Sequence, residues 1–440
     1  MELRRKMAQL ASKDRFSFHM PGHKGRFPGL FGQYDPTELP GLDNLHDPRN
    51  TLKDAQDRVA EIYGAAKTFF LVNGSSGGIM AAITALVRPG ELVLTPRNCH
   101  KSVLAGLILS GAMPLWVDQT LCPTLGHWLP PTAAALEGAL APSIRAAILT
   151  SPDYYGYVPD LASFIGACKK RATYLIVDEA HGAHLHWGHG LGLPPSALPL
   201  GADLVVQSPH KTLPALTQSA WLHVKNPALA GPLQETLNIL HTTSPSYLLL
   251  RSLEFAGTWA DTWGAAALRR LYYLAKALSL RSSQLGLELP LARNRDWSKF
   301  LLPRRRGTEA LLRSRGIYPE LVQGNLVLFM LTMADALAPA GIAALYALLP
   351  SLAALSPMAS EKISPPPFPR QEITPREAWE KPGQRVPLAR ARGRISRQVL
   401  APYPPGTMLL CPGQRLETEH VEYLLDLQAK KVIPSWLEVI

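Results

Sequence analysis

The most informative pattern for the fold is the stretch Thr68-Phe69-Phe70-Leu71-Val72-Asn73-Gly74-Ser75-Ser76-Gly77-Gly78. Its mostly apolar first part, residues 68–72, predicts a buried strand, and the glycine- and serine-rich part after it predicts a turn. An apolar helical pattern follows over residues 79–87. The stretch therefore predicts a strand–turn–helix unit, the repeating element of an α/β domain.

The same alternation continues on both sides of this unit. Residues 52–63 carry apolar side chains at helical spacing and end at Gly64, and another helix is predicted over residues 101–109. Further short apolar runs predict strands at residues 91–95, 112–117, 146–150, 174–177 and 203–207. Largely apolar strands are typical of a sheet covered on both faces, so we expect an α/β fold with a mostly parallel sheet and helices on both faces.

The chain divides into three predicted regions. Residues 1–50 are rich in Gly, Pro and His and mostly lack a helical period, which predicts an extended N-terminal arm. Residues 51–290 hold the strand–helix alternation and end in a helical stretch over 250–280, so they form the predicted large domain. Residues 291–440 form a predicted small α+β C-terminal region.

The C-terminal region has three predicted parts. Residues 325–333 predict a strand. The proline-rich, polar residues near 357–382 predict an ordered connector or loop. Residues 384–440 predict a small unit that is closed by a helix over 418–430.

Composition excludes several classes of protein. Of the 440 residues, 47% are hydrophobic and only 18% are charged, which excludes a mainly disordered chain. The four cysteines form no CxxC pair, so neither a disulfide scaffold nor a structural zinc site is predicted, and a reducing cytoplasm fits best. The basic N-terminus has no apolar segment behind it, so we expect no signal peptide.

Charge and hydropathy bear on nucleic-acid and membrane binding. The net charge is 45 − 34 = +11, and basic residues cluster at 304–306 and 390–397. Neither cluster is interleaved with aromatic residues, so a solvated basic face is favoured over a nucleic-acid interface. Residues 336–360 carry no charge, but Pro339 and Pro350 interrupt them, which favours a buried helix between the prolines over a membrane span.

Two motifs at predicted strand ends supply an anion cradle and an acid, and ligands of open parallel sheets bind at such ends. Backbone N–H groups and the hydroxyls of Ser75 and Ser76 can bind an anion at the start of a helix, although a plain glycine-rich turn fits equally. Asp178 can hold a proton on a heteroaromatic nitrogen or cap a helix. A metal role shared with Glu179 is disfavoured because the chain has no Gly-x4-Gly-Lys-[Ser/Thr] loop.

Two further motifs supply a lysine and a histidine. Lys211, within residues 207–212, is a nucleophile for carbonyls if a dry pocket lowers its pKa, and an ordinary surface lysine otherwise. His100, within residues 97–102, can stack on a flat ligand or serve the structure alone. An anion cradle, then an aspartate, then a lysine is the order that a pyridoxal-phosphate site requires.

With these motifs in place, the sequence resembles the group III Orn/Lys/Arg decarboxylases, particularly their shorter bacterial form. That family has the fold type I, aspartate aminotransferase-like architecture of pyridoxal-phosphate enzymes. The similar segments are spread over almost the whole chain, at residues 17–25, 69–78, 96–102, 151–156, 178–184, 202–218, 242–247 and 402–406.

The resemblance implies a set of roles. Lys211 would carry pyridoxal 5'-phosphate, Asp178 would pair with its ring nitrogen, His100 would stack on the ring, and His181 would lie beside it. Because family sites lie at a dimer interface, a homodimer or higher oligomer is expected. The residues implied to hold the phosphate are Ser75, Ser76, Ser208 and His210 within the subunit and Thr243 and Ser244 toward the neighbouring subunit.

The implied reaction is decarboxylation of arginine, lysine or ornithine, a step of polyamine biosynthesis. Lys211 or His210 would return the proton to Cα, and Glu38 or Asp43 would bind the cationic tail of the amino acid. The same lysine–aspartate pair also serves aminotransferases and aldolases, and a non-catalytic relative is a further alternative.

Two departures from the family pattern bear on the site. Similar proteins have Gly-Asn where this chain has Gly78-Ile79, which predicts a looser phosphate cradle, and Pro-Gly-Glu where it has Pro412-Gly413-Gln414. The missing acid at Gln414 bears on recognition of a cationic tail. A neighbouring histidine cluster is predicted to bind no metal, because its spacing fits no tetrahedral pattern: His181, His184, His186 and His189.

Overall fold

The computed structural model of the chain describes residues 2–11, 20–21, 24, 35–39, 41–122, 127–291, 294–358, 366–401 and 408–440. Of the segments similar to the family, 402–406 lies outside the described residues and 17–25 lies mostly outside them. Within the described ranges, no helix has both the length and the apolar character needed to cross a membrane.

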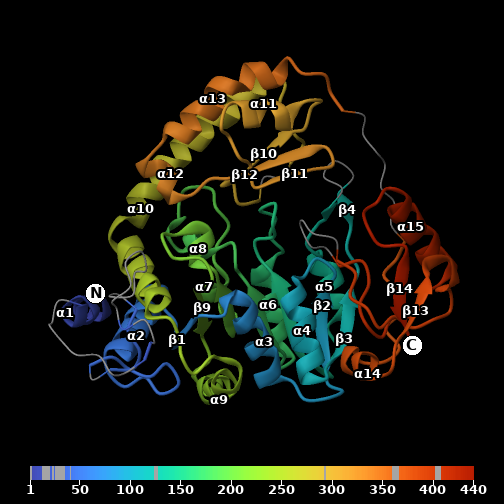
Figure 1. Cartoon of the computed structure of the whole chain (residues 1–440), viewed down its shortest axis with the longest axis horizontal. Coiled ribbons are helices and arrows are strands. Elements are labelled where there is room, and N and C mark those ends of the chain that lie inside the picture. Colours follow the sequence, from blue (N-terminus) through green and yellow to red (C-terminus); the bar gives the residue numbers. More distant parts are fainter. Residues whose placement is uncertain are drawn as a thin grey trace.

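A seven-stranded sheet forms the centre of the molecule, with strand order β1-β9-β8-β7-β6-β2-β3 (Figure 1). Pairing is parallel from β8 across to β3, whereas β9 is antiparallel to both of its neighbours. The strands are β1 (Lys67–Leu71), β2 (Leu92–Pro96), β3 (Met113–Val117), β6 (Ile144–Thr150), β7 (Tyr174–Asp178), β8 (Leu204–Gln207) and β9 (Ala220–Val224). The six strands predicted for this region are present, and β9 is an addition that the sequence analysis did not predict.

Helices cover both faces of this sheet, as predicted. Phe69 and Leu71 of β1 belong to the core under one set of helices, and Phe70 belongs to the core under the other. On the first face lie α3 (Gly74–Leu86), α4 (Lys101–Ser110) and α9 (Ala230–Leu240). On the second face lie α2 (Thr51–Tyr63), α5 (Ala133–Ala139), α6 (Leu161–Lys170), α7 (Ala197–Leu200) and the long α10 (Tyr247–Gln284).

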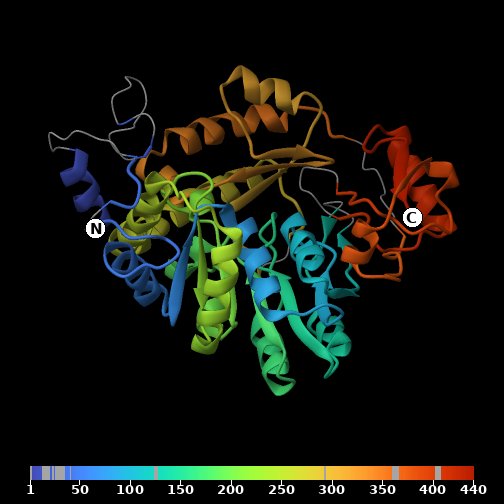
Figure 2. The ribbon, with the colours of Figure 1, turned by 60° about the horizontal axis from the view of Figure 1, so that its bottom comes forward.

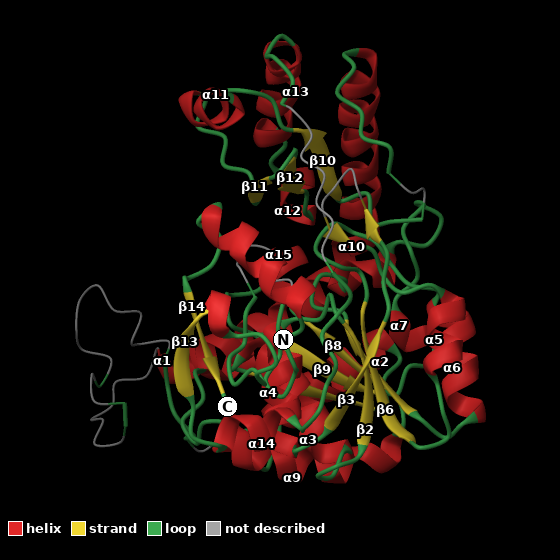
Figure 3. Cartoon of the chain, turned by 90° about the vertical axis from the view of Figure 1, so that its right-hand side faces the viewer, coloured by secondary structure: helices red, strands yellow, loops and turns green. Residues whose placement is uncertain are grey.

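A second, smaller sheet follows α10 and faces the large one across the molecule (Figures 1 and 3). Its antiparallel strands lie in the order β10 (Lys299–Pro303), β12 (Leu326–Met330) and β11 (Leu321–Gln323). Three helices accompany it: α11 (Thr308–Ser314), α12 (Met333–Leu337) and α13 (Ala340–Ala353). The predicted helix within 336–360 is therefore present, but it continues through Pro350 for one more turn instead of ending there.

The C-terminal unit lies beside the β3 edge, at the opposite end of the molecule from α1 (Glu2–Ala11) (Figure 2). Trp116 of β3 donates from Nε1 to Gln371 Oε1 at 3.0 Å, which ties the unit to the large sheet. The elements of the unit are α14 (Pro375–Glu380), β13 (Gln384–Pro387), α15 (Thr418–Ala429) and β14 (Trp436–Val439), with β13 and β14 paired. Short elements elsewhere are β4 (Leu121–Cys122), β5 (His127–Trp128), α8 (Pro209–Thr212) and the 3-10 helices η2 (Ala183–Trp187), η3 (Pro227–Leu229) and η4 (Leu388–Arg390).

Outside the large sheet, three elements differ from the predicted secondary structure or add to it. The region predicted as an extended arm begins with helix α1, because Leu3 and Met7 are buried one turn apart and Glu254 accepts from the N–H groups of Leu3 and Arg4 at 3.2 and 3.3 Å. The predicted connector contains helix α14, which starts with a capping box between Thr374 and Glu377. Strand β14, and not α15, closes the C-terminal unit.

Candidate active site

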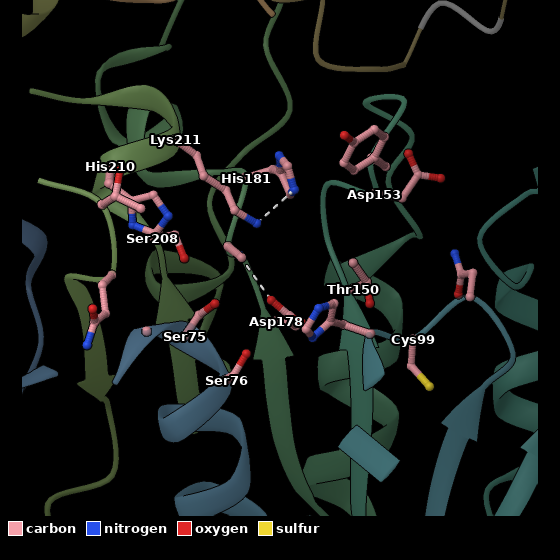
Figure 4. A pocket seen from close by; sticks show the side chains of 17 residues that line it. Ser75, Ser76, Cys99, Thr150, Asp153, Asp178, His181, Ser208, His210 and Lys211 are labelled. Carbon is pink, nitrogen blue, oxygen red and sulfur yellow. Dashed lines mark hydrogen bonds between the residues drawn. The ribbon is translucent and has the colours of Figure 1, made fainter. Parts of the chain in front are cut away.

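A cavity of about 350 Å³ opens at the carboxyl ends of the large sheet (Figure 4). This volume suits a small organic ligand. Eight of the ten site residues predicted from the sequence line it: Ser75, Ser76, His100, Asp178, His181, Ser208, His210 and Lys211. Thr243 and Ser244 are exposed and do not line it, so their predicted role toward a neighbouring subunit stays a prediction.

One side of the cavity offers hydrogen-bond donors that suit an anion. Helix α3 begins at Gly74, so Ser75 and Ser76 lie in its first turn. The sequence alone predicts a turn here, followed by a helix that starts only at residue 79. Gly74 has a φ of +67° and donates its N–H to Gln218 O at 2.8 Å, which holds the start of the helix against the loop after α8. The Ser208 hydroxyl is buried in the same region and has no hydrogen-bond partner among the described residues. A phosphate would supply that partner.

The close approach of α3 to the sheet explains Gly78. A Cβ there would lie 2.6 Å from Leu71 Cδ1 and 2.9 Å from Val206 Cγ1. Ile79, where the family pattern has a polar residue, is fully buried in the core between α3 and the sheet and does not line the cavity. The departure at Ile79 therefore leaves the lining of the cavity unchanged.

Asp178 ends β7 and His100 follows β2, the two strands that flank β6 in the sheet. The Asp178 carboxylate is 4% exposed and accepts a hydrogen bond from Ala180 N at 3.1 Å. His100 precedes α4, and its Nδ1 accepts from Ser102 N at 3.2 Å. Burial lowers the pKa of His100, which lines the cavity, so its ring is uncharged near neutral pH.

Lys211 and His181 contact each other across the cavity. Lys211 Nζ lies 3.0 Å from His181 Nε2, and Figure 4 shows the two side chains pointing toward one another. Burial lowers the pKa of Lys211; the charge of Asp178 opposes this effect and that of Lys299 adds to it. Burial and the adjacent Lys211 also hold the pKa of His181 well below its usual value. A neutral His181 Nε2 can therefore accept a hydrogen bond from the Lys211 amine.

His210 is oriented by a backbone contact. Its Nδ1 lies 2.8 Å from Ser219 O, so Nδ1 carries the proton and donates to that carbonyl. Burial lowers the pKa of His210. In its neutral form His210 offers only an acceptor, Nε2, so it contacts a phosphate oxygen favourably only after taking up a second proton.

The residues considered for the substrate tail lie elsewhere. Asp43 is buried and accepts from the N–H groups of Asn50, Leu52 and Lys53 at 2.7, 2.9 and 3.2 Å, so it caps α2. Glu38 is exposed and does not line the cavity.

Gln414 is likewise structural. Its Oε1 accepts from Cys411 N at 2.8 Å, and its Nε2 donates to Pro369 O at 3.0 Å. Both ends of the amide are thus used inside the C-terminal unit, and the residue does not line the cavity.

The sequence analysis assigned no role to several residues that line the cavity. Asp153 and Tyr154 come from the loop after β6, and Asp153 Oδ1 accepts from Tyr155 N and Tyr157 N at 2.9 Å each. Thr150 lies at the end of β6 and Asn98 follows β2. The signal that could have found them is their position directly after predicted strands.

No metal centre is found in the part of the chain that the structure describes, where no three His, Cys, Asp or Glu side chains are grouped to hold an ion. His184 instead faces Asp296, with its Nε2 3.2 Å from Asp296 Oδ2. The donors that the cavity does offer suit pyridoxal phosphate: hydroxyls for a phosphate, a carboxylate for a ring nitrogen, and an amine for an aldehyde.

Comparison with known proteins agrees with this assignment. Residues 3–281 match the family model "Orn/Lys/Arg decarboxylase, major domain", and residues 358–434 match "Orn/Lys/Arg decarboxylase, C-terminal domain". The arginine decarboxylase of Bacillus subtilis is 31% identical, over 94% of this chain and 91% of the relative. An uncharacterized protein of the same organism, YaaO, is also 31% identical, over 97% of this chain and 94% of the relative.

Solved structures show the same fold. The lysine decarboxylase LdcF of Francisella novicida superposes with a TM-score of 0.83 at 17% identity, covering 100% of this chain and 81% of that one. A lysine-to-alanine variant of the serine palmitoyltransferase of S. paucimobilis, with a bound aldimine of pyridoxal phosphate and myriocin, superposes with a TM-score of 0.55 at 15% identity, covering 68% of this chain and 75% of that one. These likenesses confirm the predicted fold type I architecture. Because the family model spans well over half of the chain, the chain belongs to the Orn/Lys/Arg decarboxylase family of pyridoxal-phosphate-dependent amino-acid decarboxylases.

Proposed function

We propose that this protein decarboxylates a basic amino acid, with arginine as the first candidate, and that Lys211 and Asp178 carry the reaction. The observation that supports this most is the placement of a half-buried amine and a buried carboxylate in one cavity beside a serine-lined helix start. When bound, the cofactor supplies an electron sink for the bond that breaks at Cα. The remaining chemistry comes from side chains of the cavity.

Each residue has a proposed task. Asp178 holds a proton on the ring nitrogen, and the neutral face of His100 packs on the ring. The lowered pKa of Lys211 increases the fraction of its amine that is neutral, and therefore nucleophilic toward the aldehyde. Ser75, Ser76 and Ser208 bind the phosphate, and His210 joins them when doubly protonated.

Lys211, assisted by His181, is the proposed donor of the proton that returns to Cα. At 3.0 Å, neutral His181 Nε2 accepts one N–H of the Lys211 ammonium and orients it, which leaves the other N–H groups of Lys211 to supply the proton to Cα. Neutral His210 has its only N–H directed at Ser219 O, which makes it a poorer donor. Of the two donors considered from the sequence, Lys211 is thus favoured.

The cationic tail of the substrate has a candidate partner in Glu320. This residue lies just before β11 of the small sheet, and its carboxylate accepts a hydrogen bond from the hydroxyl of Tyr154, which lines the cavity. Its side chain is exposed, and its negative charge acts on Lys211. An ammonium or guanidinium group entering the cavity would therefore meet Tyr154 and Glu320 together.

Arginine is preferred among the three basic amino acids because relatives that match over nearly their whole length include several arginine decarboxylases. We further propose a homodimer in the cytoplasm, with Thr243 and Ser244 reaching the neighbouring site and the product amine entering polyamine synthesis.

The test is an amino-acid panel with the purified holoenzyme, in which product amines are identified by mass spectrometry. We expect carbon dioxide and agmatine from arginine, and no visible absorbance of covalently bound cofactor in Lys211→Ala. Release of a keto acid would favour an aminotransferase, and loss of the side chain as an aldehyde would favour an aldolase. Persistence of the absorbance band in Lys211→Ala would contradict the assignment of this lysine.

A further inference from the structure

A line of four buried polar side chains crosses the large sheet beneath the cavity. Thr68 lies on β1, His223 on β9 and Gln207 on β8, and Glu179 directly follows β7. All four are 0% exposed. Thr68 and His223 are directly opposed in the antiparallel pair of β1 and β9, and the side chains share the face that α2 and α10 cover. We call these four residues the buried polar network.

Hydrogen bonds connect the network end to end. Thr68 Oγ1 lies 2.8 Å from His223 Nδ1, and His223 Nε2 lies 3.1 Å from Gln207 Oε1. Gln207 Nε2 donates to Glu179 Oε2 at 2.6 Å. Glu179 also accepts from Ser196 Oγ at 2.8 Å and, through Oε1, from Ala197 N at 2.7 Å.

The carboxylate of Glu179 sets the direction of these bonds. Burial raises the pKa of Glu179 to about 7, and the hydrogen bonds from Ala197 N, Gln207 Nε2 and Ser196 Oγ oppose this rise. All three hydrogen bonds that Glu179 makes within the described residues are accepted ones, which is the arrangement that an ionised carboxylate takes. The amide nitrogen of Gln207 must therefore face Glu179, which leaves the amide oxygen facing His223. His223 then carries its proton on Nε2, and its Nδ1 accepts from the hydroxyl of Thr68. Burial lowers the pKa of His223 to about 3, so the ring stays neutral.

Packing leaves the network little freedom. The Tyr63 ring stacks on His223 with centroids 4.6 Å apart, and the Tyr63 hydroxyl donates to Ala183 O at 2.8 Å. A Cβ at Gly182 would lie 2.5 Å from Glu179 Cγ, so the glycine is needed for the carboxylate to sit there.

The network is attached directly to the cavity. Glu179 follows Asp178 in the chain, and Gln207 precedes Ser208. Backbone bonds also join the two strand ends, from Glu179 N to Val206 O at 2.9 Å and from Ser208 N to Ala180 O at 3.3 Å. A shift of the Glu179 side chain would therefore displace Asp178, and a shift of the Gln207 side chain would displace Ser208.

We propose that the buried polar network is a positioning device for the cofactor site, in which the charge of Glu179 orders the hydrogen bonds and thereby fixes the strand ends that carry Asp178 and Ser208. The effect on the cofactor rests on the proposed function. The ordering of the bonds does not, because it involves no residue that lines the cavity.

The test exchanges the carboxylate at position 179 with the amide at position 207. In Glu179→Gln, the backbone N–H of Ala197 keeps the amide oxygen on its side, so the new amide nitrogen faces the amide nitrogen of Gln207. Two donors then face each other, and this conflict is removed only if the Gln207 amide turns over and the His223 proton moves to Nδ1. In the double variant Glu179→Gln, Gln207→Glu, the new amide at position 179 donates to the new carboxylate at position 207. That carboxylate also accepts from His223 Nε2–H, so the bonds between the four network residues are restored, while Ser196 Oγ accepts from the new amide instead of donating. We expect pyridoxal phosphate to bind about tenfold more weakly to the cofactor-free single variant, and within about threefold of wild type to the double variant.

A second readout is the tautomer of His223, measured by nitrogen NMR of histidine-labelled protein and assigned with a His223→Gln variant. The proton should lie on Nε2 in wild type and in the double variant, and on Nδ1 in Glu179→Gln. Thr236→Val, which removes a buried hydroxyl bond to Pro232 O in α9, is the control that should lower stability without changing cofactor affinity.

The proposal is overturned if Glu179→Gln binds the cofactor as wild type does, if its His223 proton stays on Nε2, or if the double variant binds no better than the single one. If Glu179→Gln does not fold, the double variant alone decides, and its failure to fold overturns the proposal as well. Wild-type protein that takes up no pyridoxal phosphate would refute the proposed function, while the tautomer comparison would still test the ordering of the network.

Discussion

Replacing Glu320 by Gln should weaken the use of a cationic substrate without affecting an uncharged one. The substitution keeps the shape and an acceptor for the Tyr154 hydroxyl, and it removes only the charge. Opposite charges about 4 Å apart attract by about 4 kcal/mol at an effective dielectric constant of about 20, and by about 1 kcal/mol in water. Because the Glu320 side chain is exposed, the lower part of this range applies. A loss of about 1–2 kcal/mol corresponds to a decrease of about 5- to 30-fold in kcat/KM.

The assay compares kcat/KM for arginine with that for an uncharged amino acid of similar length, at low and high salt. The loss should appear for arginine alone and should shrink as salt rises, since salt screens exposed charges. Glu309→Gln is a matched control in the same small domain, because Glu309 pairs with Arg304 at 2.6 Å and does not line the cavity. An equal loss for both substrates, or none for arginine, would show that Glu320 does not bind the tail.

Three further substitutions test other parts of the structure. Asp296→Ala should lower the free energy of unfolding by about 3–5 kcal/mol in urea titrations, because it removes the counter-charge of the fully buried Lys299 ammonium, which lies 3.6 Å from Asp296 Oδ2. Lys299→Met, which removes the buried ammonium itself, should lower it less. Gly78→Ala should weaken binding of pyridoxal phosphate by at least about tenfold, since its Cβ would push α3 off the sheet; unchanged binding would contradict the role given to this contact. Gln414→Glu should lower the free energy of unfolding by about 1–3 kcal/mol, because a carboxylate would face Pro369 O, and it should leave kcat/KM for arginine unchanged.

The sequence predicted most of the large sheet because each strand there is a short apolar run followed by a turn and a helix. Strand β9 was not predicted because it does not follow this rule: it runs antiparallel, lies between β1 and β8, and contains the polar residue His223. Helix α1 was not predicted either, for a different reason. Its stability comes from burial of Leu3 and from Glu254, which is far away in the sequence.

The cavity was predictable to the extent that it is built from strand ends. Lys211, Asp178 and the serine pair each follow a recognisable strand, so the rule for parallel sheets brings them together. Glu320 was not predictable in this way, because it comes from the small sheet and reaches the cavity through one contact with Tyr154. No local pattern encodes a contact between two sheets that are separated by the whole of α10.

The alternation of side chains along a strand explains why the cofactor site and the buried polar network share the same strand ends. Neighbouring residues of a strand point to opposite faces, so a residue aimed at the cavity has a neighbour aimed at the core beneath it. Asp178 with Glu179, and Gln207 with Ser208, are two such pairs where the adjacent strands β7 and β8 end, and the hydrogen bond between Glu179 and Gln207 connects the two pairs. A polar residue next to a cavity residue is therefore a place where a change of charge can alter cofactor binding without contact with the cofactor. For this reason, exchanging the positions of the carboxylate and the amide should preserve binding, whereas removing the carboxylate should not.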